Sequence, residues 1–308
     1  MSQAPWLEIF VLCHNRPDSA RAAIRSVLAQ STDGFRLTVS DNSSDDRVAQ
    51  MVQAEFPSVH LLRRGSLPPR QHFNTCIAEA CDDYFCLFHD DDLMGPEFVA
   101  ELRQVVERYP DAVAIGANAW EVNLQTGKRK PCVLGFGRYQ QIRTPRELFR
   151  RYFGRHQTGF VPFPSYIYRT AVAGQQRIPE GGGKYADVSW LLKLASLGRL
   201  VWWHRPLMDY NLHGGNDGMQ ESRRDRLSFL ALLKRHADYA GPHGLGDYRY
   251  FIHKMIVAAD ATKPQRRARV SKLRRFLRWQ KLCRHLRLSD LPALIRKMLL
   301  KHRSRELK

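Results

Sequence analysis

Short apolar runs alternate with helical patterns over the first 120 residues, and this alternation limits the possible folds more than any other feature. Residues 7–13 form an apolar run of strand length, and residues 18–30 follow with apolar residues at helical spacing. On that helix we expect the sheet-facing residues to be Ala22, Ala23, Val27 and Leu28. Further strands are predicted over 35–40, 59–62, 84–88 and 112–120, and further helices over 47–56, 71–80 and 97–109. This order is typical of an α/β fold with a mostly parallel sheet flanked by helices.

Three consecutive carboxylates follow the predicted strand 84–88, in the segment His89-Asp90-Asp91-Asp92. Open parallel sheets bind ligands at the carboxyl ends of their strands. Adjacent carboxylates repel one another unless a cation lies between them, and oxygen-rich clusters suit Mg²⁺ or Mn²⁺ that is shared with substrate phosphates. The alternative is a solvated acidic loop in which Asp92 caps the next helix.

A second acidic loop, residues 41–46, follows the predicted strand 35–40 and should lie near the triplet. Ser44 or Asp45 could serve simply as the cap of the following helix. That reading does not account for Asp41, which ends the strand at the ligand edge. We therefore expect Asp41 to accept a hydrogen bond from a nucleobase.

The positive charge of the chain is concentrated in its last 46 residues. The whole sequence has 49 Lys and Arg against 30 Asp and Glu, a net charge of +19, and residues 263–308 alone carry +15. Two amphipathic helical patterns, over 270–286 and 289–299, place Trp, Phe and Leu on the face opposite to these charged residues. Basic helices of this kind lie on anionic membrane surfaces. Nucleic-acid binding and a charged hairpin packed on the rest of the protein are the competing interpretations, and no nucleic-acid-binding motif accompanies the charge.

Several features indicate a cytoplasmic protein. The six cysteines form no CxxC pair and no zinc-type spacing, which favours reduced thiols. No apolar run reaches the length of a spanning helix, and residues 1–8 lack the layout of a signal peptide. Together with the basic tail, this predicts a protein on the inner face of the cell membrane, bound peripherally.

Several motifs resemble those of the family 2 glycosyltransferases, which have the GT-A fold. The nucleotide-sugar half of that family is matched in order by residues 9–18, 23–30, 39–44 and 88–93. Residues 184–198 resemble the family's Glu-Asp segment at a helix start, with Ala186-Asp187 in place of Glu-Asp. Residues 210–216 are similar to its Tyr-Arg-x-His segment, with Asn211 in place of Arg. The resemblance spans about residues 7–216.

The resemblance implies an inverting transferase with Rossmann-like GT-A topology. It would move a sugar from a UDP or dTDP sugar to a hydroxyl of a glycan or lipid-linked acceptor. The implied role is in bacterial surface polysaccharide synthesis. Mn²⁺ or Mg²⁺ would stabilise the leaving diphosphate, and the ligands that we expect are Asp90, Asp92 and His213. Asp187 would be the catalytic base. We expect donor contacts from Asn15, Asp41, Arg70, Asp90 and Asp91. As alternatives, His213 could simply occupy a glycine-rich turn, and Asp187 a favourable first-turn position of a helix.

The predicted organisation has three parts. Residues 1–220 form the catalytic domain, with a nucleotide-sugar half (1–120) and an acceptor half (121–220). Residues 221–262 form a helical packing segment, and 263–308 a basic helical tail.

Two other functions remain open. A sugar-nucleotide nucleotidyltransferase would require a glycine-rich phosphate loop after the first strand, and residues 13–17 contain no glycine. A nucleic-acid-binding protein would keep its affinity after loss of the acidic site.

Overall fold

The structure is a computed structural model that describes residues 4–134, 139–154, 159–213, 222–262 and 272–284. Its centre is a mixed sheet with strand order β3-β2-β1-β4-β9-β6-β10-β5, in which β7 pairs with β6 and β8 with β10. Within the described residues the strands are β1 (Leu7–Cys13), β2 (Phe35–Asp41), β3 (His60–Arg63), β4 (Tyr84–His89), β5 (Leu93–Met94), β6 (Ala114–Asn123), β7 (Arg129–Pro131), β8 (Tyr139–Ile142), β9 (Tyr166–Arg169) and β10 (Leu200–Leu212).

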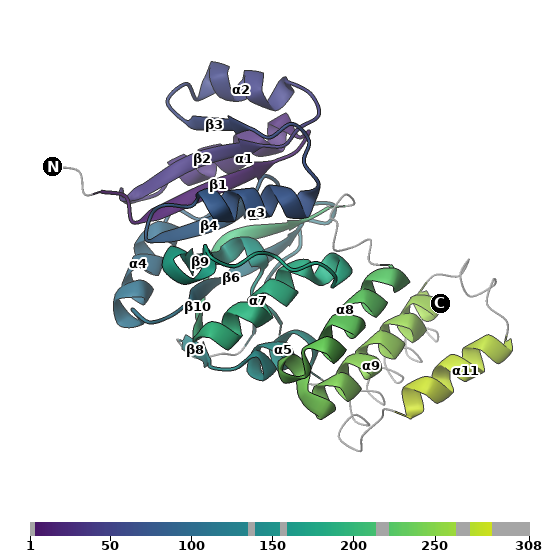
Figure 1. Cartoon of the computed structure of the whole chain (residues 1–308). Helices are drawn as coiled ribbons and strands as arrows, with labels where there is room; N and C mark the ends of the chain where they lie inside the picture. The colour runs from purple at the N-terminus through teal and green to yellow at the C-terminus, as the bar shows by residue number, and fades with distance from the viewer. Residues whose placement is uncertain (1–3, 135–138, 155–158, 214–221, 263–271, 285–308) are drawn as a thin grey trace.

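Helices cover both faces of this sheet (Figure 1). One face carries α1 (Pro17–Leu28), α2 (Arg47–Glu55) and α4 (Phe98–Arg108), and the other carries α3 (Pro69–Glu79), α5 (Pro145–Phe153) and α7 (Ala186–Leu197). Helices α8 (Arg223–Arg235) and α9 (Ala237–Thr262) pack outside this layer, where α9 contacts α5 and α8. Short helical turns lie at η1 (Phe163–Ser165), α6 (Thr170–Ala173) and η2 (Gly183–Tyr185). Ile9 and Val11 enter the first core, whereas Phe10 and Leu12 enter the second. Because strand side chains alternate between faces, β1 supplies both cores at once.

The α/β expectation for the first 120 residues is confirmed, with element ends shifted by at most three residues. The predicted inner face of the first helix is partly wrong. Ala20, Ala23, Ile24 and Val27 are buried, whereas Leu28 is 47% exposed and Ala22 also faces solvent. The buried set follows the spacing i, i+3, i+4, i+7, so the apolar stripe is rotated toward Ile24.

The carboxyl ends of β1, β2, β4, β6 and β10 meet at one edge of the sheet. The pairs β1–β2 and β1–β4 are parallel, and β9 is antiparallel to both β4 and β6. Strand β6 therefore runs in the same direction as β4, and β10 is parallel to β6. The loops after β1, β2 and β4 and the end of β10 consequently lie at the same edge, where ligands bind in open sheets of this kind.

Only part of the basic tail belongs to the described residues. Its first predicted pattern includes α11 (Lys272–Cys283), which contacts α9 and buries Leu282. On the same helix, Phe276, Leu277 and Trp279 are exposed. The second pattern, over 289–299, lies outside the described residues. Among the described helices, none combines the length and the apolar character needed to span a bilayer.

Candidate active site

The acidic triplet begins where β4 ends, at the carboxyl edge of the sheet. Asp90 is fully buried, and its Oδ2 accepts a hydrogen bond of 2.9 Å from the backbone N–H of His14. Its Oδ1 is paired with the guanidinium of Arg16, which also donates to Oδ2 of Asp91 at 2.8 Å. Burial raises the pKa of Asp90 to about 6, even though Arg16 acts in the opposite direction. The loop after β1 thus supplies a donor and a cation to the first two carboxylates.

Asp92 lies deeper than its neighbour Asp91 and is only partly satisfied. Its Oδ1 accepts a 2.9 Å hydrogen bond from the backbone N–H of Asn211 in β10. Its Oδ2 is buried and, among the described residues, has no hydrogen-bond partner. Burial and the adjacent charge of Asp91 raise the pKa of Asp92 well above its ordinary value. A buried carboxylate oxygen without a partner is an unfavourable arrangement that a bound cation would relieve.

The residues around Asp92 fit a divalent metal ion. Single ligand atoms of His89, Asp91 and Asp92 all lie within 4.8 Å of one another. His89 Nδ1 is 4.0 Å from the unpartnered oxygen of Asp92, and burial lowers the pKa of His89, which favours the neutral, metal-binding form. The two carboxylates suit Mn²⁺ or Mg²⁺, and the imidazole favours a transition metal such as Mn²⁺ over Mg²⁺.

The arrangement differs from the expected ligand set at Asp90 and His213. Both oxygens of Asp90 are engaged by His14 and Arg16, and this residue is outside the group around Asp92. His213, at the end of β10, instead reaches the triplet through Asp91, with its Nε2 2.9 Å from Oδ2 of that residue. The assignments of Asp90 and His213 as metal ligands stay predictions.

Asp187 is in the first turn of α7, and its Oδ1 accepts a 2.7 Å hydrogen bond from the N–H of Val188. Asp187 as a whole residue is half-buried, and burial of its carboxyl group raises the pKa to about 6. Burial likewise raises the pKa of Tyr210, and the charges of Asp92 and Asp187 both add to this effect. Tyr210 therefore lies within electrostatic range of the triplet and of the predicted base.

The predicted base-pocket residues connect the loops after β1 and β2. Asn15 adopts a left-handed backbone conformation (φ 56°), and its Oδ1 accepts a 2.9 Å hydrogen bond from the N–H of Ser44. Asp41 is fully buried, with Oδ1 accepting from the N–H of Ser43 and Oδ2 3.3 Å from Nε of Arg63. The two loops are thus held in place, while the contacts of Asn15 and Asp41 with a nucleobase stay predictions.

Arg70 lies at the start of α3 and is paired with Glu180 at 2.9 Å. Glu180 precedes a run of three glycines, 181–183, all with positive φ, which leads into α7. Side chains at the last two positions would collide with Ser189 and Asp225, so glycine is required there. Arg70 therefore joins the nucleotide-sugar half to the segment that carries Asp187, and its contact with a donor phosphate stays a prediction.

Sequence reasoning missed the roles of three residues. His14 and Arg16 bind the triplet, and His14 Nδ1 also lies 2.8 Å from the carbonyl oxygen of Asn42, so it connects both acidic loops. In the sequence, His89 is recognisable only as the residue before the triplet, and its place beside Asp91 and Asp92 is not. The available signal was position: all three residues stand at the carboxyl ends of adjacent strands, where ligand-binding groups gather.

The fold and this edge together define the class of protein. The sheet has parallel strands with helices on both faces, and carboxylates and a histidine lie at the carboxyl ends of these strands. Doubly wound, nucleotide-binding enzymes have this framework. A family model described as Glycosyl transferase family 2 matches residues 8–170, more than half of the chain. The chain belongs to this family, and it is a transferase with the GT-A fold.

Solved structures of low sequence identity share this fold. TarS of S. aureus, residues 1–349 in complex with UDP-GlcNAc, superposes with a TM-score of 0.58 at 14% identity, covering 84% of this chain and 74% of that one. The mannosyltransferase PcManGT of Pyrobaculum calidifontis, in complex with GDP-Man and Mn²⁺, gives a TM-score of 0.54 at 14% identity, covering 94% and 83%.

One curated relative also matches in sequence. Protein y4gI of Sinorhizobium fredii, described as uncharacterized, is 31% identical over 122 residues, which is 37% of this chain. The match covers 13% of the length of y4gI. The likeness therefore concerns one segment of a much longer protein.

Proposed function

We propose that this protein is a metal-dependent, inverting glycosyltransferase that takes its sugar from a UDP or dTDP sugar. Similar folds hold UDP-GlcNAc in TarS and GDP-Man with Mn²⁺ in PcManGT, which supports a nucleotide-sugar donor and a metal. The observation that carries the proposal is that the charges of both Asp92 and Asp187 raise the pKa of Tyr210, so the acidic triplet and the proposed base act on the same phenol. A metal-binding cluster and a base are the two groups that this reaction requires.

Asp91, Asp92 and His89 would hold the metal ion, with His213 beside Asp91. A divalent ion bound there would stabilise the negative charge that develops on the diphosphate leaving group. Arg16 keeps Asp90 and Asp91 in place from the loop after β1, and its guanidinium adds positive charge at the same edge. These contacts fix the carboxylates before the donor arrives, so little reorganisation is needed.

Asp187 would accept the proton of the acceptor hydroxyl. As that proton moves to the carboxylate, the hydroxyl oxygen forms a bond with the anomeric carbon and the bond from that carbon to the diphosphate breaks. The electron pair of the broken bond leaves with the nucleoside diphosphate. A single displacement of this kind inverts the configuration at the anomeric carbon. Because its pKa is about 6, Asp187 is mostly ionised at neutral pH and still a stronger base than an ordinary aspartate.

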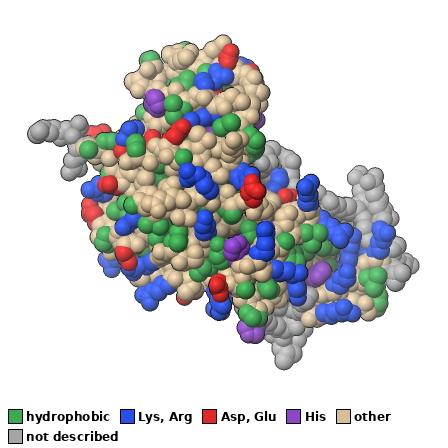
Figure 2. Space-filling model, in the orientation of Figure 1, with side chains coloured by type: hydrophobic (Ala, Val, Ile, Leu, Met, Phe, Trp, Pro, Cys, Tyr) green, Lys and Arg blue, Asp and Glu red, His purple; other side chains and the backbone are tan. Residues whose placement is uncertain are grey.

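The proposed acceptor is a glycan or a lipid-linked glycan of a bacterial surface polysaccharide, used at the inner face of the cell membrane. The described part of the basic tail supports this location. Helix α11 exposes Phe276, Leu277 and Trp279 among Lys and Arg residues, the composition of helices that lie on anionic bilayers. Figure 2 shows Lys and Arg side chains gathered over the part of the molecule formed by α8, α9 and α11.

The substitution Asp187→Asn tests the proposal directly. It removes the base but keeps the hydrogen bond from Val188, so we expect turnover to fall by about 10²–10⁴-fold with nearly unchanged donor binding. Asp18→Asn is the matched control, since Asp18 also occupies a first helical turn but is exposed. Release of nucleoside diphosphate from UDP and dTDP sugars is the measurement. Full activity of Asp187→Asn would exclude Asp187 as the base, and release of pyrophosphate instead would indicate a nucleotidyltransferase.

A further inference from the structure

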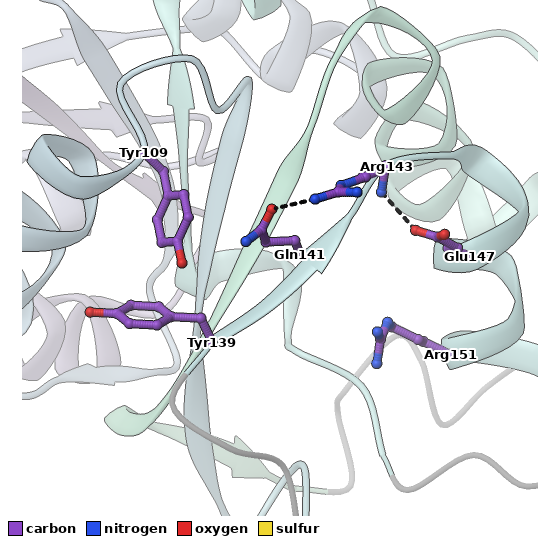
Figure 3. A pocket seen from close by; sticks show the side chains of 6 residues that line it. All are labelled: Tyr109, Tyr139, Gln141, Arg143, Glu147 and Arg151. Carbon is purple, nitrogen blue, oxygen red and sulfur yellow. Dashed lines mark hydrogen bonds between the residues drawn. The ribbon is translucent and has the colours of Figure 1, made fainter.

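A second hollow lies away from the acidic edge (Figure 3). It is a cavity of about 480 Å³ lined by Tyr109, Tyr139, Gln141, Arg143, Glu147 and Arg151. Strand β8, which supplies two of these residues, pairs with the first residues of β10, up to Trp203. Asp92 instead contacts Asn211, near the other end of β10. At the rise of a strand, these ends are roughly 25 Å apart, so the cavity lies at the opposite edge of the sheet from the acidic triplet.

One wall of the cavity is aromatic. The rings of Tyr109 and Tyr139 meet edge to face, with centroids 5.2 Å apart, and Tyr139 also stacks on Trp203 at 4.6 Å. The guanidinium of Arg108 lies 5.0 Å from the ring of Tyr139, and that of Arg199 lies 5.5 Å from the ring of Tyr109. Protein groups thus already cover much of both rings. A nucleobase would have to displace them to stack, whereas the phenol hydroxyls can form hydrogen bonds without any rearrangement.

The other wall has two arginines and one carboxylate: Arg143 precedes α5, whereas Glu147 and Arg151 belong to it. Arg143 donates to Gln141 at 3.3 Å through its side chain and to Glu147 at 2.7 Å through its backbone N–H. Arg151 donates to Gln140, and its Nε is buried without a hydrogen-bond partner among the described residues. Among the residues that the structure describes, neither Arg143 nor Arg151 forms an ion pair with a carboxylate. Figure 3 shows Arg151 extending from α5 toward the space below Glu147.

These groups suit a ligand that is both anionic and rich in hydroxyls. A partly buried guanidinium without a carboxylate is costly, and a bound carboxylate or phosphate can accept two hydrogen bonds from each guanidinium fork. The two phenols and the Gln141 amide offer hydrogen bonds suited to sugar hydroxyls. The volume falls in the range of small-molecule sites. We propose that this cavity binds an acidic oligosaccharide, at a site separate from the one where sugar transfer takes place.

The location has a consequence for the acceptor, and this part of the inference rests on the proposed function. A glycan whose growing end lies at Asp187 could be held at the cavity through sugars further along its chain, because Tyr166 is within electrostatic range of both Asp187 and Arg151. Long acidic acceptors would then have a lower KM than short ones, with little change in kcat. Binding at the cavity itself does not depend on the transfer reaction.

The test compares two pairs of substitutions in the segment 143–151, which contains the start of α5. Arg143→Gln with Arg151→Gln removes both cationic groups of the cavity. Arg146→Gln with Arg150→Gln removes two charges from exposed positions that do not line it. The probe is trigalacturonate at 150 mM NaCl, with maltotriose as the neutral comparison. Binding is measured by calorimetry, and hydrogen exchange of residues 139–154 locates it, so that nonspecific association with the basic tail is recognised.

We expect trigalacturonate to protect residues 139–154 in the full chain and the cavity pair to weaken its Kd at least tenfold. The control pair and Asp187→Asn should leave the Kd unchanged, and maltotriose should give no protection. Absence of protection, or equal loss with both pairs, would overturn the proposal. A uridine trinucleotide that binds more tightly than trigalacturonate, with the same dependence on the cavity pair, would contradict the ligand class. Donor binding, measured in every variant, shows that the fold and the transfer site are intact.

Discussion

Among single residues, charge balance dominates the carboxyl edge. Asp90, Asp91 and Asp92 bring three negative charges when ionised, and Arg16 compensates one of them. The remaining charge of −2 is equal and opposite to that of one divalent cation. The unpartnered oxygen of Asp92 marks where such an ion would bind most favourably.

The substitution Asp92→Asn should abolish metal-dependent donor binding. It keeps the size of the side chain but removes the charge and one ligand oxygen. In the unmodified protein, Mn²⁺ with UDP should raise the Tm, because a ligand that binds only the native state stabilises it. We expect this rise to disappear in Asp92→Asn and to persist in Asp18→Asn. A thermal-shift series with and without Mn²⁺ measures it, and an undiminished rise in Asp92→Asn would contradict the metal assignment.

The rate of transfer should depend on pH through Asp187. The carboxyl group must be ionised to accept a proton, and packing raises its pKa to about 6. The ionisable neighbours near it are the phenols of Tyr152 in α5, Tyr166 and Tyr168 in β9, and Tyr210 in β10, all with pKa values raised far above neutrality by burial. We therefore expect kcat to fall about tenfold per pH unit below pH 6 and to level off above it.

A pH series of kcat, with donor affinity measured at each pH, checks this dependence. A rate that stays constant between pH 5 and 7 would contradict the assignment. The same pKa shift predicts a stability effect of opposite direction. The folded pKa of Asp187 lies above the unfolded value, so its ionisation disfavours the fold as pH rises from about 4 to 6. Asp187→Asn should therefore raise the Tm at pH 7.5 and change it little near pH 4.

Among the elements, β6 shows how closely the acceptor side is packed. Gly116 faces β9, and a Cβ at this position would lie 2.7 Å from Tyr166 Cε1 and 2.7 Å from Val161 Cγ1. The hydroxyl of Tyr166 accepts a hydrogen bond from Trp202 in β10. Three neighbouring strands therefore meet at a position where only glycine fits.

Gly116→Ala should destabilise the fold by about 1–3 kcal/mol, because one added methyl group overpacks this core. Gly246→Ala is the matched control: it lies in α9, where an added Cβ would meet nothing within 4 Å, and alanine should stabilise the helix by up to about 1 kcal/mol. Urea denaturation of both variants measures the difference. Equal stability of the two variants would show that the β6–β9 contact adapts more easily than the packing indicates.

For the whole molecule, the charge distribution separates a nearly neutral body from a strongly basic tail. The first 262 residues carry a net charge of only +4, and their proposed reactive groups are acids, whereas the last 46 carry +15. The described part of this tail packs against α9 through one face and exposes aromatic and basic side chains on another. A surface of this kind would support the proposed attachment to an anionic membrane.

The protein should sediment with vesicles that contain phosphatidylglycerol and not with pure phosphatidylcholine vesicles. Phe276→Ser with Trp279→Ser should weaken this binding at least tenfold, because the two rings supply the apolar contact with the bilayer. Leu28→Ser with Leu227→Ser is the control, since both leucines are comparably exposed but lie on α1 and α8. Co-sedimentation in 50 and 300 mM NaCl measures the effect. Unchanged binding of the Phe276/Trp279 variant would rule out α11 as the attachment point.

The α/β order, the family and the position of the acidic triplet could be predicted from the residues alone, because strand length, helical spacing and short motifs are local properties of the chain. Tertiary structure decided which groups meet. Arg16 and His14 bind Asp90 from a different strand end, His89 joins Asp91 and Asp92, and the cavity beside α5 combines residues from three separate elements. Contacts of this kind depend on the strand order β2-β1-β4 and on side-chain directions, which residue spacing along the chain does not specify.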